Sequence, residues 1–179
     1  MAPLTLRRAE PADAADIARV HVQSWRESYA ELLPADLLAD LEVEARREMW
    51  ASVLSDPAGL TAVFVLESGG AIVGFGAVGD QRSTELRGAG YDGEIGAIYI
   101  LKAAQGAGAG RLLMQRMASA LSDRGMTAAS LWVLAENCTA HGFYERLGGQ
   151  VISEREERLG ELAVSEIAYG WRDLTALMG

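Results

Sequence analysis

Apolar residues recur along the chain with two periods, and these predict the order of its elements. Runs that alternate or stay apolar and are rich in β-branched residues predict strands, over residues 4–8, 61–67, 71–78, 94–100, 128–134, 151–158 and 163–171. Apolar steps of three and four residues predict helices between them. The resulting order, βααβββαβαββ, predicts an α/β fold with a mixed sheet.

The first two helices are amphipathic. The first carries an apolar stripe at four-residue steps: Ile17, His21, Trp25 and Tyr29. The second is expected to begin at Pro34 and to run on without a break, with the stripe Leu38, Leu41, Ala45, Met49 and Val53. The segment 80–92 is polar and contains glycine, so it is expected to be a surface loop.

Length and composition describe a globular chain. Its 179 residues suit one domain, expected to span 1–179, and half of them are hydrophobic. No run approaches the eighteen or so apolar residues of a membrane span, and the first residues lack the pattern of a secretory signal. One cysteine, Cys138, cannot form an internal disulfide. These features predict a cytoplasmic protein without membrane attachment.

The formal charge is −9, from 25 acidic and 16 basic residues. This balance argues against a nucleic-acid partner, whose phosphates need a basic surface. It favours cationic substrates slightly, although an acidic surface also serves solubility alone. No group of His, Cys and Asp has the spacing of metal ligands, so no metal is expected, and His21 is interpreted as a packed, hydrogen-bonded histidine.

The segment 105–110, Gln-Gly-Ala-Gly-Ala-Gly, follows a predicted strand and precedes a helix with the apolar stripe Leu113, Met114, Met117 and Leu121. Glycines leave backbone N–H groups uncovered where a helix start already has unpaired donors, a combination that binds phosphates. No Gly-Lys-Ser/Thr sequence is present, and Arg111 stands where a dinucleotide fingerprint needs its third glycine. A flexible loop without a ligand is the alternative.

Two segments together carry a family resemblance. Gln105-x-x-Gly108-x-Gly110 resembles the acyl-CoA pyrophosphate loop of the GCN5-related N-acetyltransferases, and the second signature of that family follows about thirty residues later in residues 137–149, Asn-Cys-Thr-Ala-His-Gly-Phe-Tyr-Glu-Arg-Leu-Gly-Gly. The resemblance covers essentially the whole chain and implies that the mixed sheet is mostly antiparallel and flanked by helices. It implies acetyl-CoA as co-substrate and places the acceptor near the junction of the first two helices.

Acetyl transfer from a thioester to an amine needs a base, a donor for the carbonyl oxygen and an acid for the leaving thiolate. Glu94, at the start of its strand, is the base candidate, acting through water; a solvated strand-end carboxylate is the alternative. Tyr144 is the acid candidate, or else a buried helix aromatic. The resemblance implies that backbone N–H groups near Ile98 and Ile100 bind the thioester oxygen, and that Asn137 binds the pantetheine arm, although Asn137 also suits a helix N-cap.

The resemblance further assigns the co-substrate contacts to one loop: Gln105, Gly106, Ala107, Gly108, Ala109, Gly110 and Arg111. The chain departs from the family at residues 102–104 and at Ala107, where a Lys or Arg is common, so binding would depend on backbone donors and on Arg111, which alternatively faces solvent. Trp25 and Tyr29 are candidates for acceptor binding, although aromatic residues at helical spacing usually pack inward.

The predicted function is transfer of an acetyl group from acetyl-CoA to a primary amine, by direct attack in a ternary complex. The acceptor is a small-molecule or peptide amine that the sequence does not identify. Two alternatives stay open: a module of the same fold that binds CoA without catalysis, and a plain phosphate- or nucleotide-binding protein. The sequence also leaves the oligomeric state open, a homodimer included.

Overall fold

The computed structural model describes residues 2–179 and contains all seven predicted strands within two residues of their predicted ends. The strands are β1 Leu4–Arg8, β2 Ala62–Ser68, β3 Ala71–Asp80, β4 Gly93–Ile100, β5 Ala129–Leu134, β6 Gln150–Leu159 and β7 Leu162–Trp171. The helices are α1 Ala14–Tyr29, α2 Ala35–Ala39, α3 Val43–Leu54, α4 Thr84–Gly88, α5 Ala109–Asp123, α6 Cys138–Arg146 and α7 Thr175–Met178, with short 3₁₀ turns η1 Pro11–Asp13 and η2 Lys102–Ala104.

The strands form one sheet in the order β1-β2-β3-β4-β5-β7-β6. Antiparallel pairing joins β1 to β2, β2 to β3, β5 to β7 and β6 to β7, whereas β4 and β5 are parallel. The predicted class, an α/β fold with a mixed and mostly antiparallel sheet, is confirmed.

The chain forms two compact units, residues 1–78 with 97–117 and residues 79–96 with 118–179. The division falls inside β4 and inside α5. The prediction that residues 1–179 form one N-acetyltransferase domain stays a prediction. Within residues 2–179, no helix is long and apolar enough to cross a membrane.

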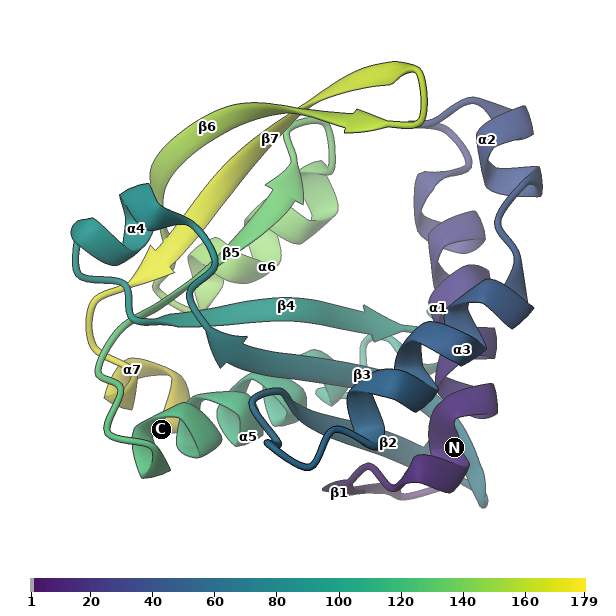
Figure 1. The fold of residues 1–179 in the computed structure, drawn as a ribbon, viewed down its shortest axis with the longest axis horizontal. Helices are drawn as coiled ribbons and strands as arrows, with labels where there is room; N and C mark the ends of the chain where they lie inside the picture. The colour runs from purple at the N-terminus through teal and green to yellow at the C-terminus, as the bar shows by residue number, and fades with distance from the viewer. Residues whose placement is uncertain (1) are drawn as a thin grey trace. The chain divides into compact units, whose positions relative to one another are not determined.

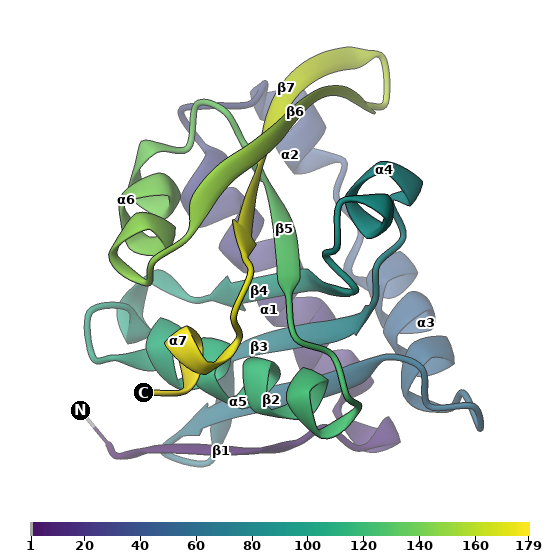
Figure 2. The same ribbon diagram turned by 90° about the vertical axis from the view of Figure 1, so that its left-hand side faces the viewer.

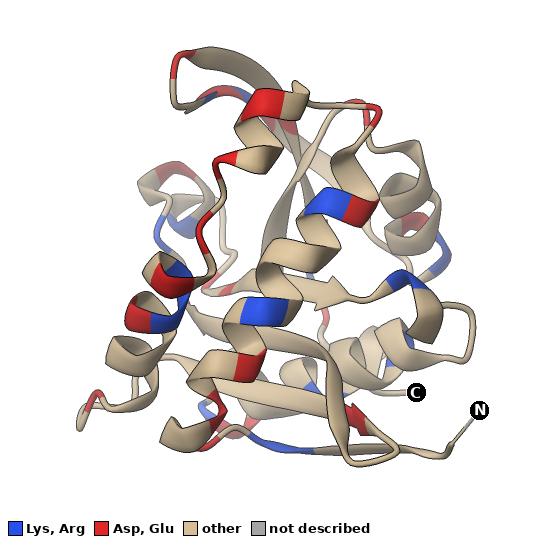
Figure 3. Ribbon diagram, turned by 90° about the vertical axis from the view of Figure 1, so that its right-hand side faces the viewer, with Lys and Arg blue, Asp and Glu red and all other residues tan. Residues whose placement is uncertain are grey.

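The first unit buries its core between strands β2 and β3 and the helices α1 and α3, which run side by side in opposite directions (Figures 1 and 3). Val63, Val65 and Phe75 contribute from the strands, and Ile17 and Trp50 from the helices. The apolar stripe of α1 is directed into this core, which explains why its sequence has an apolar residue about once in every helical turn.

The second unit is built on β5 and the long β6–β7 hairpin, which Figure 2 shows in green and yellow. Gly160 forms the hairpin turn with a φ of 63°, a conformation that glycine adopts at little cost. A small core of Leu86, Tyr91, Ala128 and Ala168 joins α4 to the sheet. The start of β4 belongs to this unit.

The prediction of one continuous second helix was wrong. The chain leaves the helical conformation at Glu42, which has a φ of −100° and a ψ of 122°, so α2 and α3 are separate. This break shifts the phase of the apolar face: Trp50 is the buried residue of α3, and Met49, expected in the stripe, is 37% exposed. The predicted apolar stripe at 38–53 therefore joined residues that belong to two separate helices.

The prediction that residues 80–92 form a plain loop was also wrong, because α4 lies inside that segment. Ser83 starts this helix as its N-cap, with its Oγ accepting a hydrogen bond from the Leu86 backbone N–H at 3.2 Å. A serine N-cap followed by an acidic residue in the first turn, here Glu85, is a recognisable helix start, and that local signal would have found α4.

Candidate active site

The glycine-rich loop leads directly into α5, as predicted. Gly106 and Gly108 have φ values of 82° and 80°, and a Cβ built on either would have open space around it. Glycine is therefore needed at these two positions for the left-handed backbone, not because neighbouring atoms crowd them. The Leu112 N–H donates to the Gly108 carbonyl at 3.0 Å. The N–H groups of residues 108–110 precede that bond and have no acceptor within the helix.

Side chains hold the loop in place from both ends. The Gln105 Nε2 donates to the carbonyl of Ile100 at 3.0 Å, so this amide closes the loop instead of extending outward. The Glu27 Oε2 accepts from the Lys102 N–H at 2.7 Å, which ties the end of α1 to the start of η2. Ala107 and Arg111 are exposed. Sequence reasoning missed this contact, because its two residues are 75 positions apart in the chain.

The two ends of β4 differ in the direction of their backbone groups. The Gly93 N–H donates to the carbonyl of Ala128, before β5, whereas the Leu101 N–H donates to the carbonyl of Val73 in β3. These two residues are an even number of positions apart, so in a regular strand their N–H groups would point to the same side. Side chains show the same change: a Cβ on Gly93 would meet Leu121 of α5, while Ala97 packs into the core beneath α1 and α3. Regular alternation cannot give both patterns, so β4 contains an irregularity between them.

This irregularity decides where the N–H groups of Ile98 and Ile100 point. Because the Leu101 N–H faces β3, alternation directs the N–H groups of Ile98 and Ile100 away from β3. Among the described residues, the pairing of β4 with β5 is limited to Gly93↔Ala129 and Glu94↔Ser130.

Glu94 is buried and paired with Arg82. The Glu94 side chain is 7% exposed, and its two oxygens accept from Arg82 Nη2 at 2.8 Å and Arg82 Nε at 3.0 Å. The Arg82 backbone N–H donates to the same carboxylate at 3.0 Å. Burial by itself raises the pKa of Glu94, but hydrogen bonds from Arg82 and the charges of Arg82 and Arg155 lower the pKa below its ordinary 4.5.

A fully buried amide supports the start of β4. The Gln81 Nε2 donates to the Gly93 carbonyl at 3.2 Å and to Ser130 Oγ at 2.7 Å, and the Gln81 Oε1 accepts from the Ser83 N–H at 3.2 Å. These hydrogen bonds hold the backbone next to Glu94 in place. Sequence reasoning missed both Gln81 and Arg82, because nothing local indicates that they pair with residues about twelve positions later.

Tyr144 and Asn137 belong to α6. Tyr144 is 7% exposed and packs among Phe143, Tyr169 and Trp171, with ring centroids 5.3, 5.6 and 6.1 Å away. Asn137 is the N-cap of α6, and its Oδ1 accepts from the Ala140 N–H at 3.2 Å. The N-cap interpretation of Asn137 is confirmed. Its predicted contact with pantetheine stays a prediction, as does the acid role of Tyr144.

An aromatic cluster occupies the facing sides of α1 and α3. His21 stacks on Tyr99 at 4.9 Å, and its Nδ1 accepts a hydrogen bond from Trp50 Nε1 at 3.0 Å. Burial, followed by the charge of Arg46, lowers the pKa of His21 to about 4. The prediction of a packed, hydrogen-bonded histidine is confirmed. Trp25 and Tyr29 continue the stripe, are half-buried and meet edge to face at 4.9 Å.

The predicted site residues fall into two groups. Trp25, Tyr29, Ile98, Ile100 and the loop 105–111 belong to the first unit, whereas Glu94, Asn137 and Tyr144 belong to the second. Within the first group, the structure brings the loop next to the end of β4 and next to Glu27 of α1. Residues 2–179 contain no group of three or more His, Cys, Asp and Glu side chains that could hold a metal ion.

Comparisons with known proteins identify the family. A model described as the acetyltransferase (GNAT) family matches residues 20–149. The chain is 35% identical over 175 residues to the uncharacterized N-acetyltransferase YuaI of Bacillus subtilis, covering 97% of this chain and 96% of that protein.

Solved structures agree with this identification. The PaiA N-acetyltransferase of Thermoplasma acidophilum in complex with coenzyme A has a TM-score of 0.75 at 14% identity, with 94% of this chain and 99% of that chain covered. YncA of Salmonella typhimurium, a putative acetyltransferase with acetyl-CoA, has a TM-score of 0.66 at 21% identity, covering 96% and 94% of the two chains. The chain therefore belongs to the acetyltransferase (GNAT) family and is an N-acetyltransferase.

Proposed function

We propose that this N-acetyltransferase transfers an acetyl group from acetyl-CoA to a primary amine by direct attack in a ternary complex. The observation that carries the proposal is the loop before α5, where left-handed Gly106 and Gly108 leave the first N–H groups of the helix uncovered. Such donors, together with the helix dipole, suit a pyrophosphate. The bound coenzyme A of the Thermoplasma protein and acetyl-CoA of the Salmonella protein support this choice of co-substrate.

The remaining roles follow the chemistry of the reaction. The N–H groups of Ile98 and Ile100, which point away from β3, donate to the thioester oxygen as it becomes negative. Glu94 removes the proton of the amine through a water molecule, and Tyr144 protonates the departing thiolate. Asn137 binds the pantetheine arm with the amide nitrogen that its N-cap bond leaves available, and Trp25 and Tyr29 border the acceptor.

The organisation that we propose is equally simple. Residues 1–179 act as one catalytic domain in the cytoplasm, and neither a metal nor a nucleic acid takes part. Arg111, which is exposed at the start of α5, adds the side-chain cation that Ala107 does not supply. Whether two copies associate as a homodimer is a separate question that gel filtration answers directly.

A substitution in the loop tests the co-substrate. Gly108→Asp places a side chain and a negative charge where we expect the protein backbone to contact the pyrophosphate. Gly125→Asp is the matched control, because Gly125 also has a positive φ, 81°, with open space around it, but follows the other end of α5. Both variants carry the same backbone strain. We expect calorimetry to show a large loss of CoA affinity only for Gly108→Asp; wild-type affinity in that variant would refute the loop assignment.

One observation favours a second candidate, a CoA-binding protein that does not transfer the acetyl group. Glu94 is held by three hydrogen bonds from Arg82, and these make it a weaker base than a free carboxylate. Release of free thiol from acetyl-CoA in the presence of a panel of amines distinguishes the candidates, because a binding protein gives no amine-dependent release. Competition between CoA and ATP for the loop tests a general nucleotide binder.

A further inference from the structure

Three hydrogen-bond donors on α1 and α3 have no oxygen or nitrogen acceptor among the described residues. Trp25 Nε1 is buried and has no hydrogen-bond partner among residues 2–179. Arg46 is half-buried on α3 and forms no ion pair within the described residues; its nearest polar contact is the Met49 sulfur, 3.8 Å from Nη1. A buried donor without a partner is uncommon in native proteins and calls for a physical explanation.

The third donor is His21, whose tautomer is decided by Trp50. An indole N–H can only donate, so the His21 Nδ1 that accepts it at 3.0 Å must be unprotonated. With the pKa of this histidine lowered to about 4, the ring is neutral near pH 7 and carries its one proton on Nε2. No acceptor for Nε2 is present in the described part of the chain. His21 therefore offers an N–H and cannot act as a base in this arrangement.

Helix geometry brings these donors together. Trp25 follows His21 by four residues on α1, and Arg46 precedes Trp50 by four residues on α3, which is about 6 Å along each helix. Because the two helices run in opposite directions and His21 contacts Trp50, both steps lead the same way along the pair, so Arg46 and Trp25 lie at the same end of the His21–Trp50 contact. The Arg46 charge is also close enough to act on His21.

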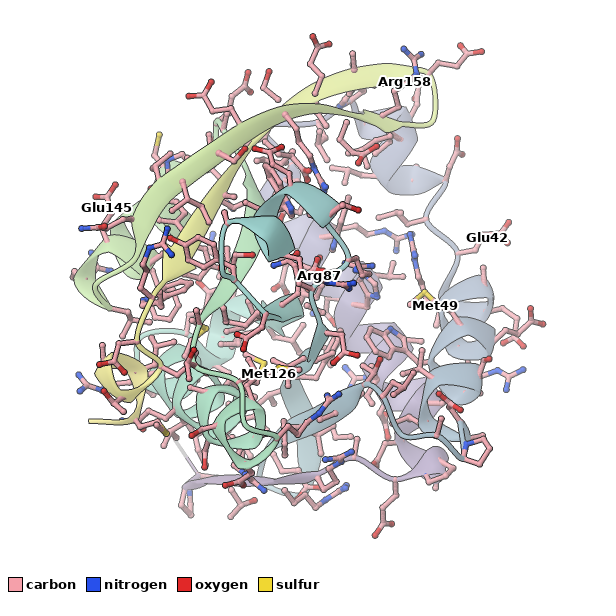
Figure 4. The ribbon with its side chains drawn as sticks, turned by 60° about the vertical axis from the view of Figure 1, so that its left-hand side comes forward. Glu42, Met49, Arg87, Met126, Glu145 and Arg158 are labelled. Carbon is pink, nitrogen blue, oxygen red and sulfur yellow. The ribbon has the colours of Figure 1, made fainter. Side chains whose placement is uncertain are left out.

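Arg46 borders a cavity of about 240 Å³ at the junction of α2 and α3. Asp40 and Glu42 line the same cavity, but neither carboxylate pairs with Arg46 within the described residues, and Figure 4 shows Glu42 extending outward from the start of α3. A chain of net charge −9 thus leaves Arg46, a half-buried cation, without a carboxylate partner.

We infer that Arg46, His21 and Trp25, here called the donor cluster, bind the carboxylate of an acceptor that carries both a primary amine and a carboxylate. A carboxylate supplies only acceptors and satisfies an arginine and several N–H groups at once. The inference rests on the proposed acetyl transfer and narrows its acceptor to amino-acid-like amines. A protein N-terminus, whose α-carboxyl is consumed in a peptide bond, does not match the donor cluster.

A binding experiment tests the donor cluster without turnover. Protein labelled with ¹⁵N-tryptophan gives four indole N–H resonances, and Trp25→Phe identifies that of Trp25. The probes are the N-acetyl forms of the common L-amino acids, which have a carboxylate but no reactive amine, and the matching N-acetyl amides. We expect at least one carboxylate to shift the Trp25 resonance while its amide does not. Equal shifts from both, or no shift from any carboxylate, would overturn the inference.

Two variants test whether the Arg46 charge causes the shift of the Trp25 resonance. Arg46→Met keeps the length of the side chain and removes the guanidinium, and we expect it to abolish the shift. Arg47→Met is the matched control, because Arg47 lies next in the chain and already pairs with Glu44. It should retain the shift. A full shift in Arg46→Met would contradict the proposed carboxylate contact.

Turnover separates this inference from the proposed function. With amino acids and their α-amides as acceptors, Arg46→Met should lower kcat/KM for the carboxylate forms roughly tenfold to a hundredfold, as expected for a lost charge-assisted hydrogen bond, and leave the amides unchanged. If amines without a carboxylate react best, the inference fails and acetyl transfer stands. If carboxylates bind but no amine releases thiol, acetyl transfer fails and the carboxylate site stands.

Discussion

The pair formed by Arg82 and Glu94 allows a prediction that separates structure from catalysis. Arg82→Met removes two charge-assisted hydrogen bonds, of 2.8 and 3.0 Å, but keeps the backbone N–H that donates to the same carboxylate. Glu94 stays buried without its main counter-charge. Because the Arg82 side chain is 76% exposed, solvent screening reduces the loss, and we expect about 1–2 kcal/mol of unfolding free energy. For a chain of this length that corresponds to a fall in Tm of roughly 3–6 °C.

The sign of the pH dependence follows from the lowered pKa of Glu94. A carboxylate whose pKa is lower in the folded than in the unfolded state contributes stability above its ordinary pKa, here 4.5. That contribution is lost as the pH falls through the folded value. Because burial raises the pKa of Glu94 once the Arg82 guanidinium is gone, the stability difference between wild type and Arg82→Met should be complete above that raised pKa and shrink as the pH falls toward the lower pKa of the wild type. Chemical denaturation at a series of pH values measures it.

The same variant reports on the proposed base. Without the Arg82 guanidinium, burial raises the pKa of Glu94, so the acid limb of kcat/KM should move to higher pH; Glu94→Gln should weaken that limb most. Arg124→Met is the control, since its pair with Asp80 is exposed and should cost at most about 1 kcal/mol without moving the limb. An acid limb that keeps its position in Arg82→Met and persists in Glu94→Gln would remove Glu94 from the mechanism.

Three further predictions follow from single contacts. Tyr144→Phe keeps the packing of the ring, so turnover should fall about a hundredfold to ten-thousandfold while acetyl-CoA affinity holds; full turnover would leave Tyr144 a core aromatic. The pKa of His21 is lowered from 6.5 to about 4, so the unfolded state binds more protons than the folded state between these pH values. The unfolding free energy of the wild type should therefore fall by roughly 2 kcal/mol from pH 6.5 to about pH 5. A fall of similar size in His21→Phe would contradict this reasoning. Glu27→Gln weakens the acceptor for the Lys102 N–H, so KM for acetyl-CoA should rise more than kcat falls; an unchanged KM would show that the loop does not need this contact.

The strands and the loop were predictable because their signals are local. Period-two apolar runs define β1 to β7, and glycines at alternate positions mark the loop whatever surrounds it. The break between α2 and α3 was not predictable, because the three- and four-residue spacing of apolar residues continues across Glu42 although the backbone leaves the helical conformation there. Arg82 was not predictable either: its pairing depends on where β3 ends and on which face of β4 Glu94 occupies, and one irregularity in β4 changes that face.

Contacts from distant parts of the chain also explain how a segment so rich in glycine keeps a defined backbone shape. Left-handed Gly106 and Gly108 would give a mobile loop if nothing held their flanks, since glycine gains the most conformational freedom on release. Three hydrogen bonds oppose this: Leu101 N–H to Val73, the Gln105 side chain to Ile100, and Lys102 N–H to Glu27. The glycines therefore supply a backbone shape and uncovered donors, while residues from α1, β3 and β4 supply the rigidity. An anion that meets donors already in place loses little affinity to ordering of the loop, so the proposed pyrophosphate site does not need a lysine within the loop.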